Sequence, residues 1–201
     1  MITIKDNQED MTLLINGLKQ AENKKVQIGI FAETDGEVLK YAIVHEYGGT
    51  IKPKKKFIAI PLKKELKGKN PRDFDLKFIR TTDGKYFLAM QKGKQLEPYY
   101  LLVREVKIPE RSFIRSTFDN STNIDNIIKN AEPVLQMFLD GKKSIDEYLK
   151  ALGIEMEGTI KQRIMGAEFQ ANSALTVNLK GENTPLKDSG NMLRAIVSKV
   201  I

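Results

Sequence analysis

The chain of 201 residues contains no cysteine, and this absence excludes several chemistries at once. Disulfide bonds, cysteine-ligated zinc, thiol catalysis and iron–sulfur clusters all need a thiol. His45 is the single histidine, so a zinc site built on two imidazoles is also excluded. No apolar run reaches the roughly 18 residues of a membrane helix, and the polar residues at the N-terminus do not form a secretion signal. We therefore expect no metal, no cofactor and no membrane span, and a protein made in the cytoplasm.

Signatures of nucleotide binding and of serine hydrolysis are missing as well. Neither G-x-x-x-x-G-K-[ST] nor G-x-G-x-x-G occurs, and the glycines at 48–49 follow a helical pattern where a phosphate-binding loop would precede a helix. Asp188 and Ser189 are adjacent, as in an activated nucleophile. A nucleophile elbow, however, needs small residues two positions to either side of the serine, where this chain has lysine and asparagine. The sequence therefore predicts no catalytic residues and no enzyme.

The same acidic, hydroxyl and glycine residues are typical of a chain entering a helix. Asp188 or Ser189 can accept an unpaired backbone N–H as an N-cap, and Gly190 permits a tight entry. Leu193 and Ile196 would then bury one face of the short helix. We interpret this segment as a capped turn.

Positive charge exceeds negative charge and is concentrated in one segment. The chain has 33 Lys and Arg against 26 Asp and Glu, a formal net charge of +7. Residues 51–69 hold eight lysines and one glutamate around the apolar sequence FIAIPL. Such a segment either contacts DNA or an acidic partner, or is an edge strand that lysines protect from aggregation. The candidate contacts are Lys52, Lys54, Lys55, Lys56, Lys63 and Lys64.

The periodicity of apolar residues predicts both helices and strands. Helical spacing occurs over 7–22, 37–49, 121–140 and 144–170, and strand-like patterns occur over 24–32, 75–94, 96–108 and 195–201. Asp83-Gly84 is a tight-turn signal, so 75–94 is predicted to be a β-hairpin. With 41% hydrophobic residues the chain can bury a core. We predict one α+β domain over 1–201: a small, mostly antiparallel sheet with flanking helices, a long helical hairpin in the C-terminal half, and a β-rich basic insertion at 62–107.

The sequence IPERSFIR at 108–115 separates the β-rich region from the helices. Pro109 fixes the backbone before it joins a helix. We expect Arg111 to reach a carboxylate and Phe113 to enter the core at the first turn. This role is mainly architectural, although an arginine placed here also suits an ion pair between subunits.

Three short motifs occur in a fixed order, and this order resembles the virion morphogenesis proteins of tailed bacteriophages. Members of that family show a helix ending in E-[FY]-G, a P-x-R-x-F-[IL]-R block and a terminal P-L-x-D-[ST]-G-x-L. The matching residues of this chain are Glu46, Tyr47 and Gly48; Pro109, Arg111, Phe113 and Arg115; and Pro185, Leu186, Asp188, Ser189, Gly190 and Leu193. The resemblance covers 24–60 and 108–201. Gly49 and the β-rich stretch at 62–107 depart from the family pattern.

The resemblance implies a structural protein of the virion, assembled in the bacterial cytoplasm, and no catalysis. Such a protein is a neck or tail-completion component that forms a ring with its own copies and joins head to tail. Its partners would be neighbouring connector and tail proteins, and the basic segment would make a non-specific contact with DNA crossing the channel.

A second interpretation rests on charge alone. The net charge of +7 and the basic hairpin also suit a nucleic-acid-binding module encoded by a mobile element.

Overall fold

The structure is a computed structural model that describes residues 8–166, 168–187 and 189–201. Its contacts group the chain into two compact units. A helical unit comprises Met1–Glu46, Ser112–Glu168 and Ser189–Ile201, and a sheet unit comprises Tyr47–Arg111 and Phe169–Asp188. The sequence predicted a single domain with an insertion at 62–107, whereas the sheet unit takes in more of the chain on both sides of that insertion and adds a second segment.

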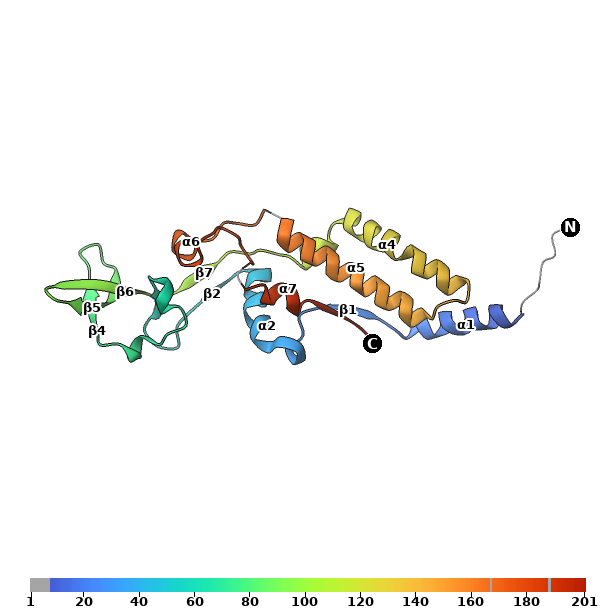
Figure 1. Cartoon of the computed structure of the whole chain (residues 1–201), viewed down its shortest axis with the longest axis horizontal. Helices are drawn as coiled ribbons and strands as arrows, with labels where there is room; N and C mark the ends of the chain where they lie inside the picture. Colours follow the sequence, from blue (N-terminus) through green and yellow to red (C-terminus); the bar gives the residue numbers. More distant parts are fainter. Residues whose placement is uncertain (1–7, 167, 188) are drawn as a thin grey trace. The chain divides into compact units, whose positions relative to one another are not determined.

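The helical unit combines helices with a two-stranded antiparallel ribbon (Figure 1). Its elements are α1 (Gln8–Glu22), β1 (Val26–Gly29), α2 (Ala32–Tyr47, the last residue already in the sheet unit), α3 (Arg115–Phe118), α4 (Ser121–Leu139), α5 (Ile145–Gly166), α7 (Asn191–Ala195) and β8 (Val197–Val200).

The helices α4 and α5 form the predicted helical hairpin and lie side by side (Figure 1). Asn120 caps α4, because its side chain accepts a 3.0 Å bond from the Thr122 N–H. Gly141, with φ +71°, follows the end of the helix, where a left-handed glycine commonly terminates one. The buried apolar residues recur at helical spacing on both helices: Ile127, Ala131 and Phe138 on α4, and Ile145, Ile160 and Ile164 on α5.

The ribbon of β1 and β8 packs on α5, so segments from both ends of the chain meet in one core. A Cβ at Gly153 would lie 2.5 Å from the Ser198 hydroxyl, so only glycine fits this close approach without a shift. Glu157 then accepts bonds from the Ser198 N–H at 2.7 Å and its hydroxyl at 2.8 Å. The predicted C-terminal strand is confirmed.

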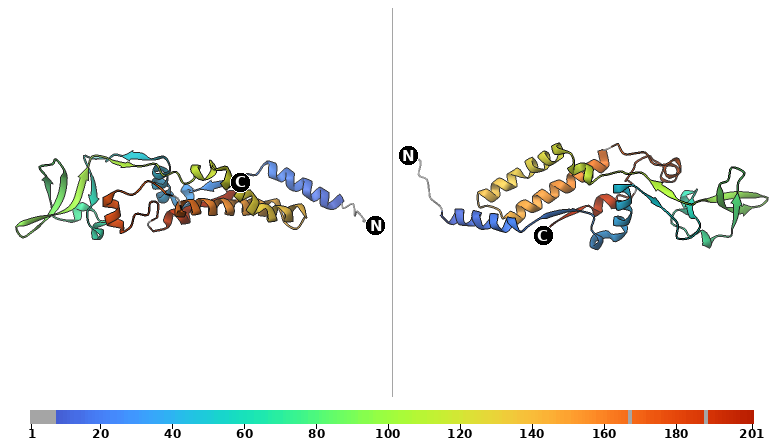
Figure 2. Two further views of the ribbon diagram at one scale, coloured as in Figure 1. Left: turned by 90° about the horizontal axis from the view of Figure 1, so that it is seen from above. Right: turned by 180° about the vertical axis from the view of Figure 1, so that it is seen from behind.

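The sheet unit contains two separate antiparallel sheets (Figure 2). One pairs β2 (Gly49–Ile51) with β7 (Val106–Ile108). The other has the order β3-β6-β5-β4, from β3 (Ile58–Pro61), β4 (Leu76–Arg80), β5 (Tyr86–Lys92) and β6 (Gln95–Val103). Two 3-10 turns, η1 (Lys64–Leu66) and η2 (Pro71–Asp73), and the helix α6 (Ala174–Lys180) complete it.

The α+β class is confirmed, but the strands pair differently from the prediction. The described strands form three small sheets rather than one. The pattern at 96–108 is two strands in different sheets, and the four-stranded sheet begins at Ile58, before the predicted start at 62. The Asp83-Gly84 hairpin is confirmed, with Gly84 at φ +80°. Strand β3 lies at one edge of its sheet, as one interpretation of the lysine segment expected.

Within the described ranges, none of the helices combines the length and hydrophobicity needed to cross a bilayer.

Candidate functional site

A buried carboxylate joins the first two sequence motifs. Glu46 lies in the last turn of α2 and is 5% exposed. Its Oε1 accepts bonds from the Ser112 hydroxyl at 2.8 Å and the Arg115 N–H at 2.9 Å. Its Oε2 accepts bonds from the N–H groups of Phe113 at 2.8 Å and Ile114 at 3.0 Å. We call Glu46 together with residues 112–115 the Glu46 clamp.

The local sequence explains why these donors are available. Residues 112–115 lead into the short helix α3, where backbone N–H groups have no partner in the preceding turn. Ser112 also accepts a 3.1 Å bond from the Ser116 N–H, which fixes the serine that donates to Glu46. The chain leaves the helical unit after Glu46 and re-enters it at Ser112, so the Glu46 clamp holds the exit and re-entry points of this unit together.

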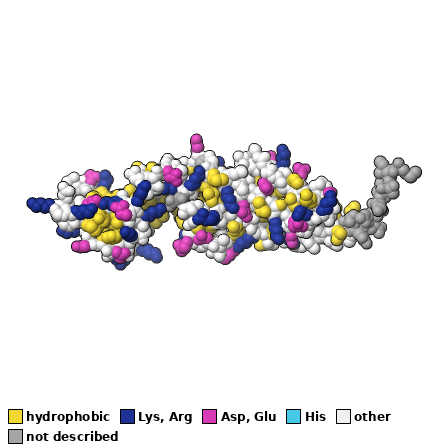
Figure 3. All heavy atoms as spheres, viewed as in Figure 1, with side chains coloured by type: hydrophobic (Ala, Val, Ile, Leu, Met, Phe, Trp, Pro, Cys, Tyr) yellow, Lys and Arg dark blue, Asp and Glu magenta, His cyan; other side chains and the backbone are white. Residues whose placement is uncertain are grey.

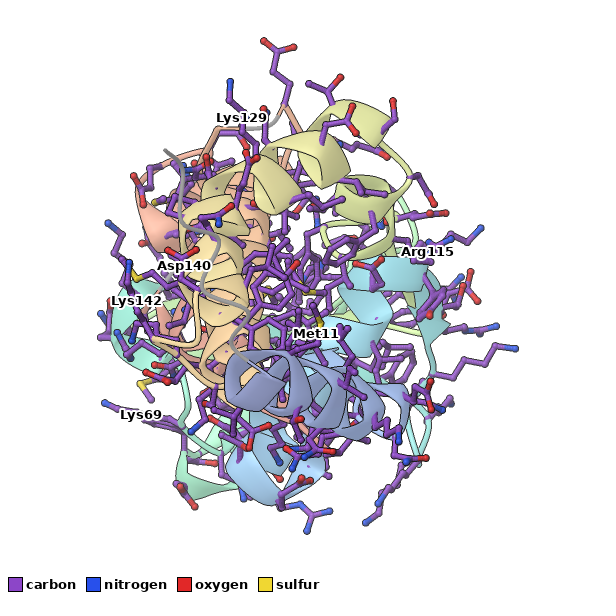
Figure 4. All side chains as sticks on the ribbon, turned by 90° about the vertical axis from the view of Figure 1, so that its right-hand side faces the viewer. Met11, Lys69, Arg115, Lys129, Asp140 and Lys142 are labelled. Carbon is purple, nitrogen blue, oxygen red and sulfur yellow. The ribbon has the colours of Figure 1, made fainter. Side chains whose placement is uncertain are left out.

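Arg115 binds Glu46 through two different groups. Its Nε lies 3.3 Å from the carboxylate Oε1, and its Nη2 donates a 2.9 Å bond to the backbone carbonyl of Glu46. Figure 4 shows Arg115 beside α2. The guanidinium therefore neutralises the carboxylate and also satisfies a carbonyl at the end of the helix.

Electrostatics keep the Glu46 carboxylate ionised. Burial by itself raises the pKa of this carboxyl, but the N–H groups of Ile114, Arg115 and Phe113 and the Ser112 hydroxyl outweigh burial and bring the pKa below its ordinary value. Each oxygen already accepts two hydrogen bonds, so neither is available to bind a metal or to accept a substrate proton. The arrangement is suited to holding backbone segments in place.

Phe113 occupies the core, as predicted. Its side chain is 0% exposed, and its carbonyl accepts a 2.6 Å bond from the hydroxyl of Thr117, which is itself fully buried.

Arg111 joins the two chain segments of the sheet unit. Its Nε donates to the Gln170 carbonyl at 2.8 Å, and its Nη2 donates to the Ala171 carbonyl at 3.1 Å and to the Asn172 side-chain oxygen at 3.4 Å. Burial lowers the pKa of this guanidinium, which nevertheless stays charged at neutral pH. The sequence predicted a carboxylate partner for Arg111. These three bonds go to carbonyl and amide oxygens, and the arginine that binds Glu46 is Arg115.

The residues after Glu46 have different environments. Tyr47 is 60% exposed. Gly48 has φ +68°, and a Cβ there would lie 2.9 Å from the backbone nitrogen of Glu110, which follows Pro109. Both the backbone conformation and the close approach therefore require glycine.

The third motif only partly follows its prediction. Asp188 lies outside the described residues. The N-cap residue of α7 is Gly190, at φ +75°, and no side chain accepts a capping bond there. The prediction that Ser189 is the N-cap is therefore wrong. Ser189 is exposed, and its carbonyl accepts a 3.0 Å bond from Arg194. The chain reaches this turn from Pro185 through Leu186, a leucine at φ +62°.

Of the two residues predicted to bury one face of α7, only one is fully buried. Ile196 is fully buried, whereas Leu193 is half-buried; Met192 and Ala195 are the buried residues of the helix itself.

The candidate lysines divide into two groups. Lys52, Lys54, Lys55, Lys56 and Lys64 are exposed. Lys63 is half-buried, forms an ion pair with Glu97, and its Nζ lies 4.6 Å from the centre of the Tyr99 ring. Lys63 is therefore engaged within the sheet unit.

His45 lies half-buried on α2. Among the residues that the structure describes, no group of three or more His, Asp or Glu side chains is placed to hold a metal ion.

Sequence reasoning missed a cluster of three aromatic rings, from Phe57, Phe78 and Tyr86. The hairpin signal could have placed Phe78 and Tyr86 on adjacent strands. The contact with Phe57 depends on the pairing of β3 with β6, for which the sequence carries no local signal.

Comparison with known protein families, with curated proteins and with solved structures finds no match for this chain. The resemblance to phage virion proteins therefore rests on the three motifs alone.

Proposed function

We propose that the protein is a structural component of a tailed-bacteriophage virion, a neck or tail-completion protein that assembles as a ring and joins head to tail. One observation carries the proposal: Glu46 of the first motif is bonded directly to Phe113 and Arg115 of the second. Two motifs that are distant in sequence are thus bonded to each other in the fold. This is expected of motifs that a family keeps because they maintain its structure.

The chemistry of the site supports a role in assembly rather than catalysis. The Glu46 carboxylate is saturated with hydrogen bonds, and Phe113 is wholly enclosed. A residue set of this kind fixes the shape of a unit that other proteins then contact.

Exposed apolar side chains on the helical unit are candidates for contacts between copies. On α1, Met11, Ile15 and Leu18 are spaced by four and three residues, so they share a helix face, and each is more than 40% exposed. Ile124 and Ile128 are likewise exposed and one turn apart on α4. Exposed apolar groups of this kind mark protein interfaces, and contacts that repeat head to tail around an axis close a ring.

The test is the mass of the full-length protein in solution as its concentration rises, together with electron microscopy of any assemblies. Ile15→Glu and Leu18→Glu should abolish association, whereas the matched control Asn16→Glu, at an exposed polar position on the same helix, should leave it unchanged. The proposal fails if the protein stays monomeric at every concentration and phage particles made without this chain are filled, tailed and infectious.

The charge of the sheet unit supports the alternative, a nucleic-acid-binding module of a mobile element. Its segment Tyr47–Arg111 holds 17 Lys and Arg against seven Asp and Glu, a net charge of 17 − 7 = +10. This exceeds the net charge of the whole chain, which is +7. Binding of duplex DNA that weakens steeply with salt, in a protein that never associates with itself, would favour this function.

A further inference from the structure

Three aromatic rings form a cluster on the four-stranded sheet. The centre of the Tyr86 ring lies 5.1 Å from that of Phe57 and 5.7 Å from that of Phe78, and the centres of the two Phe rings are 6.3 Å apart. The Phe78 and Tyr86 rings are stacked, with 29° between their planes. We call these three residues the aromatic face.

Strand register explains why the rings meet. Tyr86 is paired with Arg80, two residues after Phe78 on β4, and paired residues of antiparallel strands share a face. Across the sheet, Tyr86 is paired with Leu102, which is paired with Ala59, two residues after Phe57. All three rings therefore project from the same side of the sheet.

The aromatic face is open at one edge. Leu102, on the same side of the sheet, is 8% exposed and belongs to the core of the unit. Phe78 lies on β4, the edge strand, and is 57% exposed. A ring that served only to fill this small core would be covered, whereas Phe78 presents much of its surface to solvent.

Two cations lie beside the aromatic face. The guanidinium carbon of Arg80 lies 5.7 Å from the centre of the Tyr86 ring, and Lys56 Nζ lies 5.7 Å from that of Phe57. Exposed Lys54 and Lys55 immediately precede Lys56. Figure 3 shows apolar side chains among Lys, Arg, Asp and Glu side chains at the left, where Figure 1 places β4 to β6.

Two acidic residues of this sheet form ion pairs. Asp83, in the hairpin turn, binds Lys85 at 2.7 Å, and Glu97 binds both Lys63 and Lys92. With Arg80 and Lys56 beside the rings, the charge at the aromatic face is predominantly positive.

We propose that the aromatic face binds single-stranded nucleic acid, with unpaired bases stacking on Phe78 and Tyr86 and with phosphates near Arg80 and Lys54–Lys56. A flat exposed ring next to cations suits a base attached to a phosphate. In a duplex the bases are stacked on one another and cannot stack on the protein's rings. Duplex DNA would therefore interact mainly through its phosphates with the cations. This activity goes beyond the proposed role in the virion and does not depend on it.

The first experiment measures fluorescence anisotropy of a labelled oligothymidylate of roughly 20 nucleotides, longer than one binding site, with the full-length protein. Phe78→Ala should weaken binding roughly five- to a hundredfold, because one stacking contact is removed. The matched control Leu96→Ala removes another exposed apolar side chain of the same sheet and should leave affinity unchanged. Duplex DNA of the same length should respond little to either change.

Salt dependence separates stacking from charge. Phe78→Ala should lower affinity equally at all salt concentrations, because a ring neutralises no phosphate. Arg80→Ala should reduce the slope of log affinity against log salt by about 0.7, the value for one phosphate contact on a single strand. Neutralising Lys54, Lys55 and Lys56 together should reduce it by about 2.

Further variants keep the test independent of folding. Phe78→Tyr retains a ring and should retain binding, whereas Phe78→Leu retains apolar bulk and should not; circular dichroism of each variant checks the fold. The proposal is overturned if the oligothymidylate does not bind at low salt, or if Phe78→Leu binds it as tightly as the unchanged protein. A Phe78→Leu protein that still assembles but no longer binds single strands would leave the virion proposal intact.

Discussion

Arg115 contacts Glu46 at both its side chain and its main chain: the guanidinium lies 3.3 Å from the carboxylate and donates a 2.9 Å bond to the carbonyl. One arginine thus fixes the end of α2 to the start of α3. These two points are where the chain leaves and re-enters the helical unit. The Glu46 clamp should therefore contribute strongly to the stability of that unit.

Replacing Glu46 with alanine tests this contribution. The change leaves three backbone N–H groups, the Ser112 hydroxyl and the Arg115 Nε without the carboxylate, and loss of one partner of a buried charged network costs about 3 kcal/mol or more. Thermal or urea unfolding measures the loss. The control Glu37→Ala lies on the same helix at an exposed position and should change the free energy of unfolding by less than about 0.5 kcal/mol. Equal stability of the two variants would show that the clamp is unimportant.

The pH dependence of stability should carry the signature of Glu46. Because the pKa of this carboxyl is lowered in the folded state, the stabilisation is complete above the ordinary value of 4.5 and is lost as pH falls through the folded-state pKa. Glu46→Gln should therefore be less stable than the unchanged protein near neutral pH, and the difference should shrink in acid. Urea unfolding at a series of pH values measures it. A difference that is constant across the range would contradict the prediction.

Gly48→Ala should destabilise the protein by roughly 1–3 kcal/mol. The residue has φ +68°, which L side chains rarely adopt, and the added Cβ would meet the Glu110 backbone nitrogen at 2.9 Å. Backbone cannot move aside as a flexible side chain can. The control Gly36→Ala has no atom within 4 Å of the new Cβ and should be neutral or stabilising. A melting temperature unchanged by Gly48→Ala would show that the chain relaxes there.

The sequence predicted the elements that local pattern determines. The apolar stripes of α4 and α5 and the Asp83-Gly84 turn are strong local signals, and each produced the expected element. Strand partners are not a local property. The pairing of β1 with β8 joins residues near opposite ends of the chain, and periodicity does not specify such a partner.

The buried carboxylate could have been found from spacing. Val38, Ala42 and Glu46 are four residues apart on α2, so they share one helix face, and all three are buried. An acid in line with two apolar residues indicates a carboxylate that finds its partners inside the protein. The partners themselves could not be found in this way, because the Ser112–Arg115 donors are distant in sequence. At α7 the residue types correctly indicated a helix start, but the cap fell on Gly190 rather than on Ser189.

Arg111→Lys should loosen the sheet unit locally. Lysine keeps the charge but lacks the planar fork that reaches the carbonyl oxygens of Gln170 and Ala171 together. Because these bonds hold residues 170–187 against the end of the first segment of the unit, we expect amide hydrogen exchange over 170–187 to accelerate roughly tenfold or more. Exchange in α4 and α5 should be unchanged, because the bonds from Arg111 to residues 170–172 lie within the sheet unit, whereas α4 and α5 belong to the helical unit. The control Arg104→Lys changes an exposed arginine of the same unit and should leave exchange as it is. If exchange over 170–187 is equally slow in both variants, packing rather than the guanidinium holds this segment in place.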